Sequence, residues 1–318
     1  MNRQPLWRST PPAIFPVILG LVGLSLAWRG LGQSFGLTAG FGDILLGVTT
    51  VLLAFFALSY VAKLIARPGV LMEDLKSPPG RAGLSAISMS FIVFAAGLLP
   101  YGELARYVWW FGILLHVVIV TFVVKSISKA PPEGRSVTPF QLLPFVGLIT
   151  APLAGVALGY TLISQVLTYL SLVVLVVILV KLAAKFIRTR PPEPLRPSYA
   201  IILAPMGLFG MAFGQFGPEI LFTVFYILAW VVALVLLVFA KWLTASGFSP
   251  VWGGLTFPVA VFTNINIMAI SKGFGLVATT GAIAGGLIAT ALIFFIAYKA
   301  LKMWAKRDLA KKTGSAVA

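Results

Sequence analysis

Alternate hydrophobic segments of this chain are interrupted by proline, glycine and phenylalanine, whereas the segments between them are smooth. The interrupted segments lie at about residues 12–31, 82–99, 140–159, 199–216 and 250–270, and the smooth ones at about 41–65, 101–124, 161–187, 218–243 and 275–303. Proline inside a helix removes a backbone hydrogen bond, and in lipid the freed polar groups must face protein or a water-filled cavity. The pattern therefore predicts that the interrupted segments line an interior space and that the smooth segments face lipid.

The composition is that of a helical membrane protein. Hydrophobic residues make up 59% of the chain and charged residues only 10%, which lies outside the range of soluble domains. A membrane-spanning helix needs about 20 apolar residues, so ten such helices with short connections use nearly all 318 residues. We predict an all-α integral membrane protein, one transmembrane domain over residues 1–318 with short tails, and no enzyme.

The net charge of +16 is distributed as a topology signal rather than as a nucleic-acid-binding surface. In the ten-helix arrangement, all but three of the 24 Lys and Arg residues fall on one side of the membrane, the exceptions being Arg29, Arg106 and Lys272. Because positive residues are retained on the cytoplasmic side, both termini are predicted to be cytoplasmic. The expected surroundings are a lipid bilayer, and no nucleic-acid partner is expected.

The smooth segments begin at a regular spacing of about 57–60 residues, which is typical of a repeated helical hairpin. Five such hairpins cannot pair as two halves, so we predict a closed ring of five with one helix of each hairpin inside. The polar tail at residues 306–318 is expected to be frayed.

Few residues are suited to chemistry. The chain has no cysteine and one histidine, His116, in the middle of a smooth segment. A packed, hydrogen-bonded histidine is the favoured interpretation, and a proton relay is the alternative. No cluster of side chains has metal-ligand spacing, and no cofactor is expected.

Phenylalanines in the interrupted segments could point toward a common axis and block an uncharged pore. The pore-lining or hinge candidates are Phe15, Pro16, Gly20, Phe91, Phe94, Phe145, Pro144, Pro152, Pro205, Phe209, Phe213, Thr256, Pro258 and Phe262. Core packing is the competing interpretation for most of these rings. Phe257 is the predicted gate, because Gly253 and Gly254 thin its helix and Pro258 kinks it just beyond the ring.

Three motifs resemble one family in their order along the chain. Residues 15–21 read FPVILGL and are followed by SLAW at 25–28, residues 202–205 read ILAP, and Trp252 precedes TFP at 256–258. These motifs resemble the tellurite-resistance/C4-dicarboxylate transporter family, which includes bacterial TehA-like proteins and the slow anion channels of plant guard cells. The resemblance covers essentially the full length.

The resemblance implies five helical hairpins in a quasi-fivefold ring, with the odd-numbered helices lining a central pore. It also implies a homotrimer with one pore per subunit in a bacterial inner membrane, and a gating phenylalanine that corresponds to Phe257. The expected function is an anion channel-like permease for small inorganic or organic anions. The alternative is a proton-coupled carrier or exporter of C4-dicarboxylates, sulfite or tellurium oxyanions.

Overall fold

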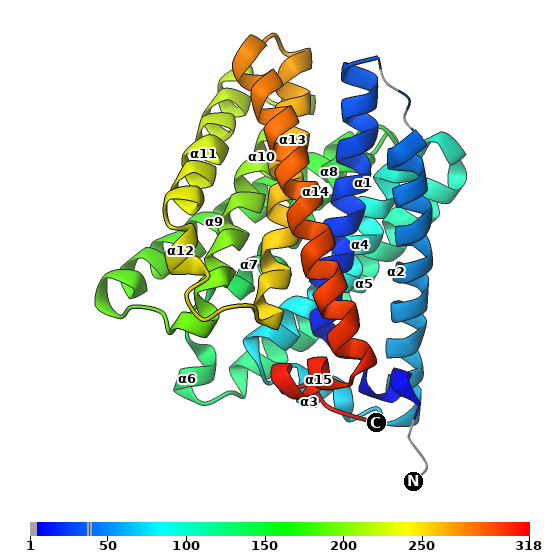
Figure 1. Ribbon diagram of the computed structural model, residues 1–318, viewed down its shortest axis with the longest axis vertical. Coiled ribbons are helices and arrows are strands. Elements are labelled where there is room, and N and C mark those ends of the chain that lie inside the picture. The colour runs from blue at the N-terminus through cyan, green and yellow to red at the C-terminus, as the bar shows by residue number, and fades with distance from the viewer. Residues whose placement is uncertain (1–4, 37, 39) are drawn as a thin grey trace.

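The computed structural model describes residues 5–36, 38 and 40–318, and every regular element in these ranges is helical (Figure 1). Nine helical spans in the described residues are long and apolar enough to cross a membrane. They are Pro12–Ser34, Gly40–Ala66, Pro78–Gly97, Glu103–Ser128, Thr161–Arg188, Glu193–Phe216, Glu219–Val238, Pro250–Ser271 and Gly275–Ala305. The prediction of an all-α membrane protein is confirmed. Ten spans were expected, and the one expected at residues 140–159 is instead a shorter apolar stretch, Pro139–Gly155.

The interrupted segments form an inner layer. They are α1 (Phe15–Ser34), α4 (Pro78–Gly97), Pro139–Gly155, η6 with α10 (Glu193–Ile202 and Leu203–Phe216), and α13 (Gly253–Ser271). We call these the inner segments. Because Pro139–Gly155 is the fifth of the ten apolar segments in chain order, we call it the fifth segment. Contacts join α1 to α4, α4 to the fifth segment, the fifth segment to α10, α10 to α13, and α13 back to α1, so the inner segments close a ring.

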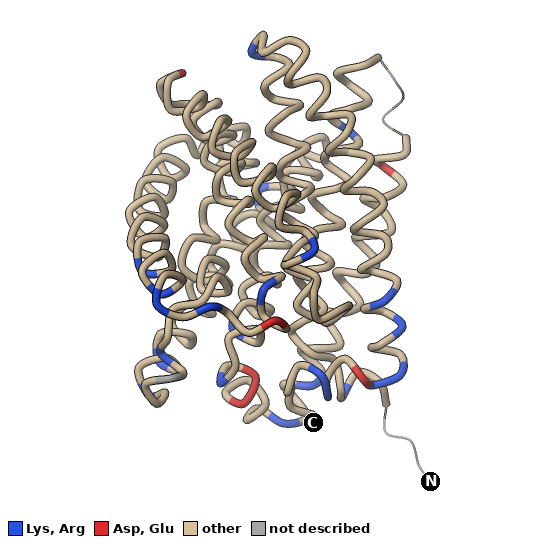
Figure 2. Tube along the Cα trace, turned by 60° about the vertical axis from the view of Figure 1, so that its left-hand side comes forward, with Lys and Arg blue, Asp and Glu red and all other residues tan. Residues whose placement is uncertain are grey.

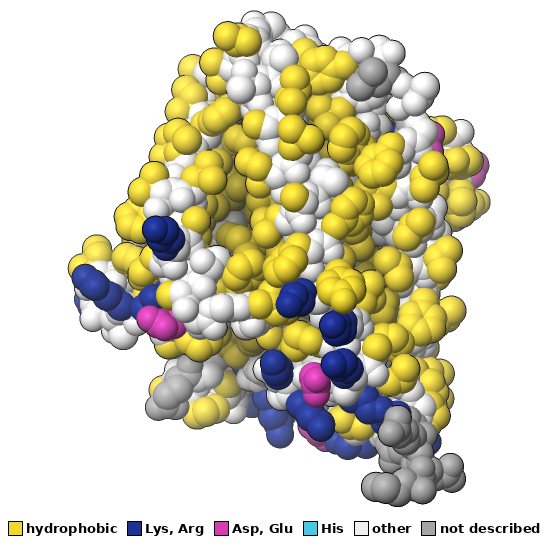
Figure 3. All heavy atoms as spheres, in the orientation of Figure 1, with side chains coloured by type: hydrophobic (Ala, Val, Ile, Leu, Met, Phe, Trp, Pro, Cys, Tyr) yellow, Lys and Arg dark blue, Asp and Glu magenta, His cyan; other side chains and the backbone are white. Residues whose placement is uncertain are grey.

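The smooth segments pack outside this ring, each against the inner segment that precedes it in the chain. These outer helices are α2 (Gly40–Ala66), α5 (Glu103–Ser128), α9 (Thr161–Arg188), α11 (Glu219–Val238) and α14 (Gly275–Ala305). Between 56% and 89% of the most apolar window of each long inner span is buried, against 22% to 44% for the outer helices. Apolar side chains accordingly cover the face that α14 presents in Figure 3.

The fifth segment is not a continuous helix. It consists of η4 (Pro139–Gln141), α7 (Leu142–Val146), η5 (Gly147–Thr150) and α8 (Pro152–Gly155). Two of its prolines, Pro144 and Pro152, lie inside the apolar stretch and lack the N–H groups that a continuous helix would use. By contrast, α13 continues through Pro258 as one helix.

Most Lys and Arg residues lie toward the end of the bundle that holds the C-terminus, which we call the basic end (Figure 2). Here Lys63 and Asp74 form a fully buried ion pair, with Nζ 3.0 Å from Oδ2. The other carboxylate oxygen of Asp74 accepts hydrogen bonds from the Ser315 hydroxyl (2.7 Å) and the Ala316 N–H (2.8 Å).

The prediction of a frayed tail is wrong. Residues Asp308–Thr313 form a short helix, α15, in which Leu309 and Ala310 are only 1% and 2% exposed. The residues that follow supply donors to a buried carboxylate, and a buried charge needs such partners. That requirement orders a segment whose composition alone suggested fraying.

Candidate functional site

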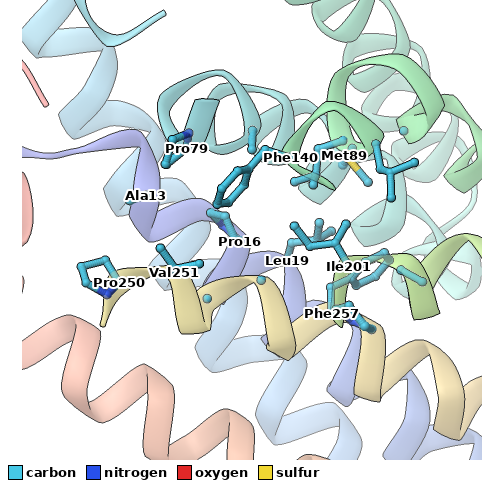
Figure 4. A pocket seen from close by; sticks show the side chains of 18 of the residues that line it. Ala13, Pro16, Leu19, Pro79, Met89, Phe140, Ile201, Pro250, Val251 and Phe257 are labelled. Atoms are coloured by element: carbon cyan, nitrogen blue, oxygen red, sulfur yellow. The ribbon is translucent and has the colours of Figure 1, made fainter. Parts of the chain in front are cut away.

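A cavity of about 250 Å³ lies inside the ring and is lined by residues from all five inner segments. We call it the vestibule. Figure 4 shows Pro79 and Pro250 toward one end of it and Phe257 toward the other. Lys312 and Thr313 of α15 also line it, so it extends toward the basic end.

The vestibule wall is mainly apolar. Leu19 from α1, Met89 from α4, Leu143 from the fifth segment and Leu208 from α10 all contribute to it. Among the described residues that line it, Lys312 is the one charged side chain. An ion inside the vestibule would therefore meet little polar surface to replace its water, and this favours ions that lose water easily.

Four of the predicted gate, pore-lining or hinge residues line the vestibule, namely Pro16, Pro205, Phe257 and Pro258. The Phe257 side chain is 6% exposed. Its ring lies over Gly23 of α1, where an added Cβ would be 3.2 Å from Cδ2 and 3.3 Å from Cε2. The bare backbone of Gly23 thus provides the space in which the ring lies.

Two polar side chains tie α13 to α1 on either side of Phe257. The Thr256 hydroxyl lies 2.8 Å from the carbonyl oxygen of Pro16. Two turns further along, the Asn264 amide donates to the carbonyl of Gly23 at 3.0 Å. Thr256 and Gly20 belong to this interface rather than to the vestibule wall, since a Cβ on Gly20 would lie 2.3 Å from Thr256 Cβ.

Five candidate rings are turned toward the outer helices and do not line the vestibule. The contacts are Phe15 with Tyr60, Phe91 with Phe111, Phe209 and Phe213 with Phe225, and Phe262 with Trp230, at centroid distances between 5.0 and 6.2 Å. These rings fill the space between the two layers.

The remaining candidates also lie outside the vestibule wall. Phe94 is buried on α4, whereas Phe145 on α7 is half-buried. Pro144 and Pro152 lie within the broken fifth segment.

His116 is fully buried and hydrogen-bonded between three segments. Its Nδ1 lies 2.8 Å from the Ser88 hydroxyl of α4, and its Nε2 lies 3.0 Å from the carbonyl oxygen of Pro144. Because a carbonyl can only accept, Nε2 carries the proton in this bond. The favoured sequence interpretation, a packed and hydrogen-bonded histidine, matches this geometry.

Sequence reasoning did not single out Leu19, Met89, Leu143, Leu208 or Lys312, all of which line the vestibule. The four apolar residues have no signal that separates them from ordinary core residues. Lys312 lies in the tail that was expected to be frayed. No group of metal-ligating side chains occurs in the part of the chain that the structure describes.

The sequence profile of the voltage-dependent anion channel family (SLAC1) matches residues 9–303. A search of curated protein sequences gives no match.

Proposed function

Because the chain belongs to the voltage-dependent anion channel family, we propose that it conducts small anions through the ring of inner segments and that Phe257 closes this path. The chain is an anion channel or transporter of that family and not an enzyme. The observation that carries the proposal is the vestibule itself, to which all five inner segments contribute and in which Phe257 lies at the opposite end from Pro79 and Pro250 (Figure 4).

The surroundings of Phe257 support a gate that moves by side-chain rotation. Thr256 and Asn264 hold α13 against α1 on both sides of the ring, so separating the two helices would break both hydrogen bonds. Rotation of the ring away from Gly23 breaks neither. Ring rotation is therefore the smaller change, and it is the proposed opening step.

The wall of the vestibule supports a preference for weakly hydrated monovalent anions. Among the described residues, none that lines its inner part carries a positive charge that could replace a tightly held water shell, so entry is governed by dehydration. Lys312 and the neighbouring positive residues of the basic end raise the local anion concentration at the mouth. Nitrate should therefore permeate better than sulfate.

The test compares Phe257→Ala with Phe262→Ala, whose ring packs on Trp230 outside the vestibule. Both proteins are reconstituted into planar bilayers, and anion current is measured beside the amount of folded, monodisperse protein. Removing the gate should give a large constitutive current with folded protein. Loss of a core ring should instead cost stability, by about 3–5 kcal/mol, without raising the current.

A folded Phe257→Ala protein that conducts no more than wild type would overturn the gate assignment. Current and uptake measurements together decide between a channel and a coupled carrier. A linear current that does not saturate supports a channel, whereas saturable, proton-dependent uptake would instead establish a coupled carrier.

We also propose the arrangement in the membrane: one transmembrane domain in the bacterial inner membrane, with both termini cytoplasmic and three subunits each holding its own pore. The collection of Lys and Arg at the basic end supports this orientation. Protease cleavage of α15 in inside-out but not right-side-out vesicles would test it. Native mass spectrometry would test the trimer.

A further inference from the structure

The fifth segment is a membrane-buried wall of the vestibule that lacks a continuous helix. None of its four helical pieces is longer than five residues. Helix ends leave backbone carbonyls without a regular partner, and such groups are costly in lipid unless the protein satisfies them. Hydrogen bonds from neighbouring helices add to those within the segment.

Two ring N–H groups of α5 add hydrogen bonds to this segment. Trp109 donates from Nε1 to the carbonyl of Ala151 at 2.9 Å, and this carbonyl also accepts from the Gly155 N–H at 2.9 Å. His116 donates from Nε2 to the carbonyl of Pro144 at 3.0 Å. Both rings are completely buried. One acceptor is the carbonyl of Pro144 itself, and the other belongs to Ala151, the residue before Pro152.

The two bonds are in register. The donors are separated by seven residues on α5, and the acceptors are separated by seven residues in the reverse direction, so the two segments run antiparallel with matched spacing. Seven residues are close to two helical turns, which places both donors on one face of α5.

Glycine makes room for each ring just beyond its acceptor. A Cβ on Gly147 would lie 2.7 Å from Cε1 of His116, and a Cβ on Gly155 would lie 2.7 Å from Cζ2 of Trp109. The same pairing of ring donor, carbonyl and glycine thus occurs twice. A repeated arrangement of this kind is not explained by general core packing.

We propose that Trp109 and His116 are positioning residues that hold the fifth segment in the wall of the vestibule. The proposal rests on the proposed function, because Leu143 and Gly147 of this segment face the vestibule. The Ser88 hydroxyl completes the site at His116. Its one proton is shared between His116 Nδ1 and the carbonyl of Ser85, each 2.8 Å away.

The test uses the absence of native cysteine. A single cysteine is placed at Leu143 in the full-length protein, and its rate of reaction with a small anionic methanethiosulfonate reagent reports the position of the wall. His116→Leu removes both ring nitrogens, and Trp109→Phe removes the indole N–H while keeping an aromatic ring. Each should change the labelling rate several-fold and also change the nitrate-to-sulfate permeability ratio.

Two controls separate positioning from general damage. His116→Gln keeps an N–H at the reach of Nε2 and should restore the wild-type labelling rate. Trp110→Phe makes the same substitution one residue along, on a half-buried ring that packs against Trp109 and Tyr160, and should leave the rate unchanged. If His116→Leu yields no folded protein, recovery of folded protein by His116→Gln supports the proposal, and failure of both overturns it.

Wild-type labelling and permeability in folded His116→Leu and Trp109→Phe proteins would overturn the assignment. Because labelling requires no current, the two proposals fail separately. Altered labelling with no anion current in any variant, including Phe257→Ala, would preserve the positioning role and reject the conduction proposal.

Discussion

Two inner segments, α13 and the fifth segment, both contain proline within the membrane and accommodate it differently. Helix α13 remains continuous from Gly253 to Ser271 through its single internal proline, Pro258. The fifth segment, with prolines at 144 and 152, is divided into four short pieces. Both contribute to the same vestibule, so its wall combines a regular helix with an irregular backbone.

The neighbours that stabilise the two segments also differ. Helix α13 is hydrogen-bonded to another inner segment, α1, through Thr256 and Asn264. The fifth segment is hydrogen-bonded to an outer helix, α5, through Trp109 and His116. The helix that carries the predicted gate is thus hydrogen-bonded within the inner layer, whereas the irregular wall is hydrogen-bonded to the outer layer.

The largest expected effect of disturbing the α1–α13 side comes from Gly20→Val. The first added atom would lie 2.3 Å from Thr256 Cβ, so the helices must move apart. Overpacking of this kind lowers stability by roughly 1–3 kcal/mol, measured as thermal unfolding in detergent. Gly47→Val is the control, because nothing lies within 4 Å of the Cβ position there. Equal stability of the two variants would contradict a close α1–α13 contact.

A smaller effect is expected when the polar ties are removed. Asn264→Ala deletes a side-chain hydrogen bond to α1. Thr256→Val deletes a hydroxyl whose one proton is shared between the carbonyls of Pro16 on α1 and Gly253 on its own helix. Each change should lower stability by about 1 kcal/mol. Thr279→Val on α14 serves as the control, since its hydroxyl is exposed and donates within its own helix to Gly275. The same unfolding assay applies. If the control loses as much stability as the two variants, the hydrogen bonds from Thr256 and Asn264 to α1 stabilise the protein no more than a hydrogen bond within one helix does.

The smallest expected effect is that of Pro258→Ala. Helix α13 is already continuous at this position, so alanine fits the backbone and restores an N–H group. The change in stability should be within about 1 kcal/mol, near the range of ordinary helix propensity differences. A substantially larger loss in the unfolding assay would show that the proline itself holds the helix in shape, and the contrast with the fifth segment would weaken.

The inside-outside order of the segments could be predicted from the sequence, because interior prolines are confined to one alternate set. The same signal identified Pro16, Pro205 and Pro258, which line the vestibule. The directions of the aromatic rings could not be predicted. Phe209 and Phe213 lie in a helix that is buried almost all round, so no apolar periodicity distinguishes the face toward α11 from the face toward the vestibule.

The hydrogen bonds of the fifth segment were also beyond sequence reasoning. Two prolines indicate an interruption, but the register of α5 against the segment follows from packing. His116 is 28 residues from each of its partners, Ser88 and Pro144. Nothing local to any of the three residues shows that they meet. The sequence likewise gives no sign that Trp109 donates to Ala151, which is 42 residues away.

The buried carboxylate at the basic end has a consequence for how the protein is made. Asp74 receives hydrogen bonds from Ser315 and Ala316, which are synthesised 241 and 242 residues later, and its partner Lys63 also bonds to the carbonyl of Thr10. Contributions from the first and last stretches of the chain thus meet at one ion pair. A nascent chain interrupted after α14 would have all its spans inserted and this pair incompletely bonded. The buried carboxylate would then lack two of its hydrogen-bond donors, which is costly for a buried charge.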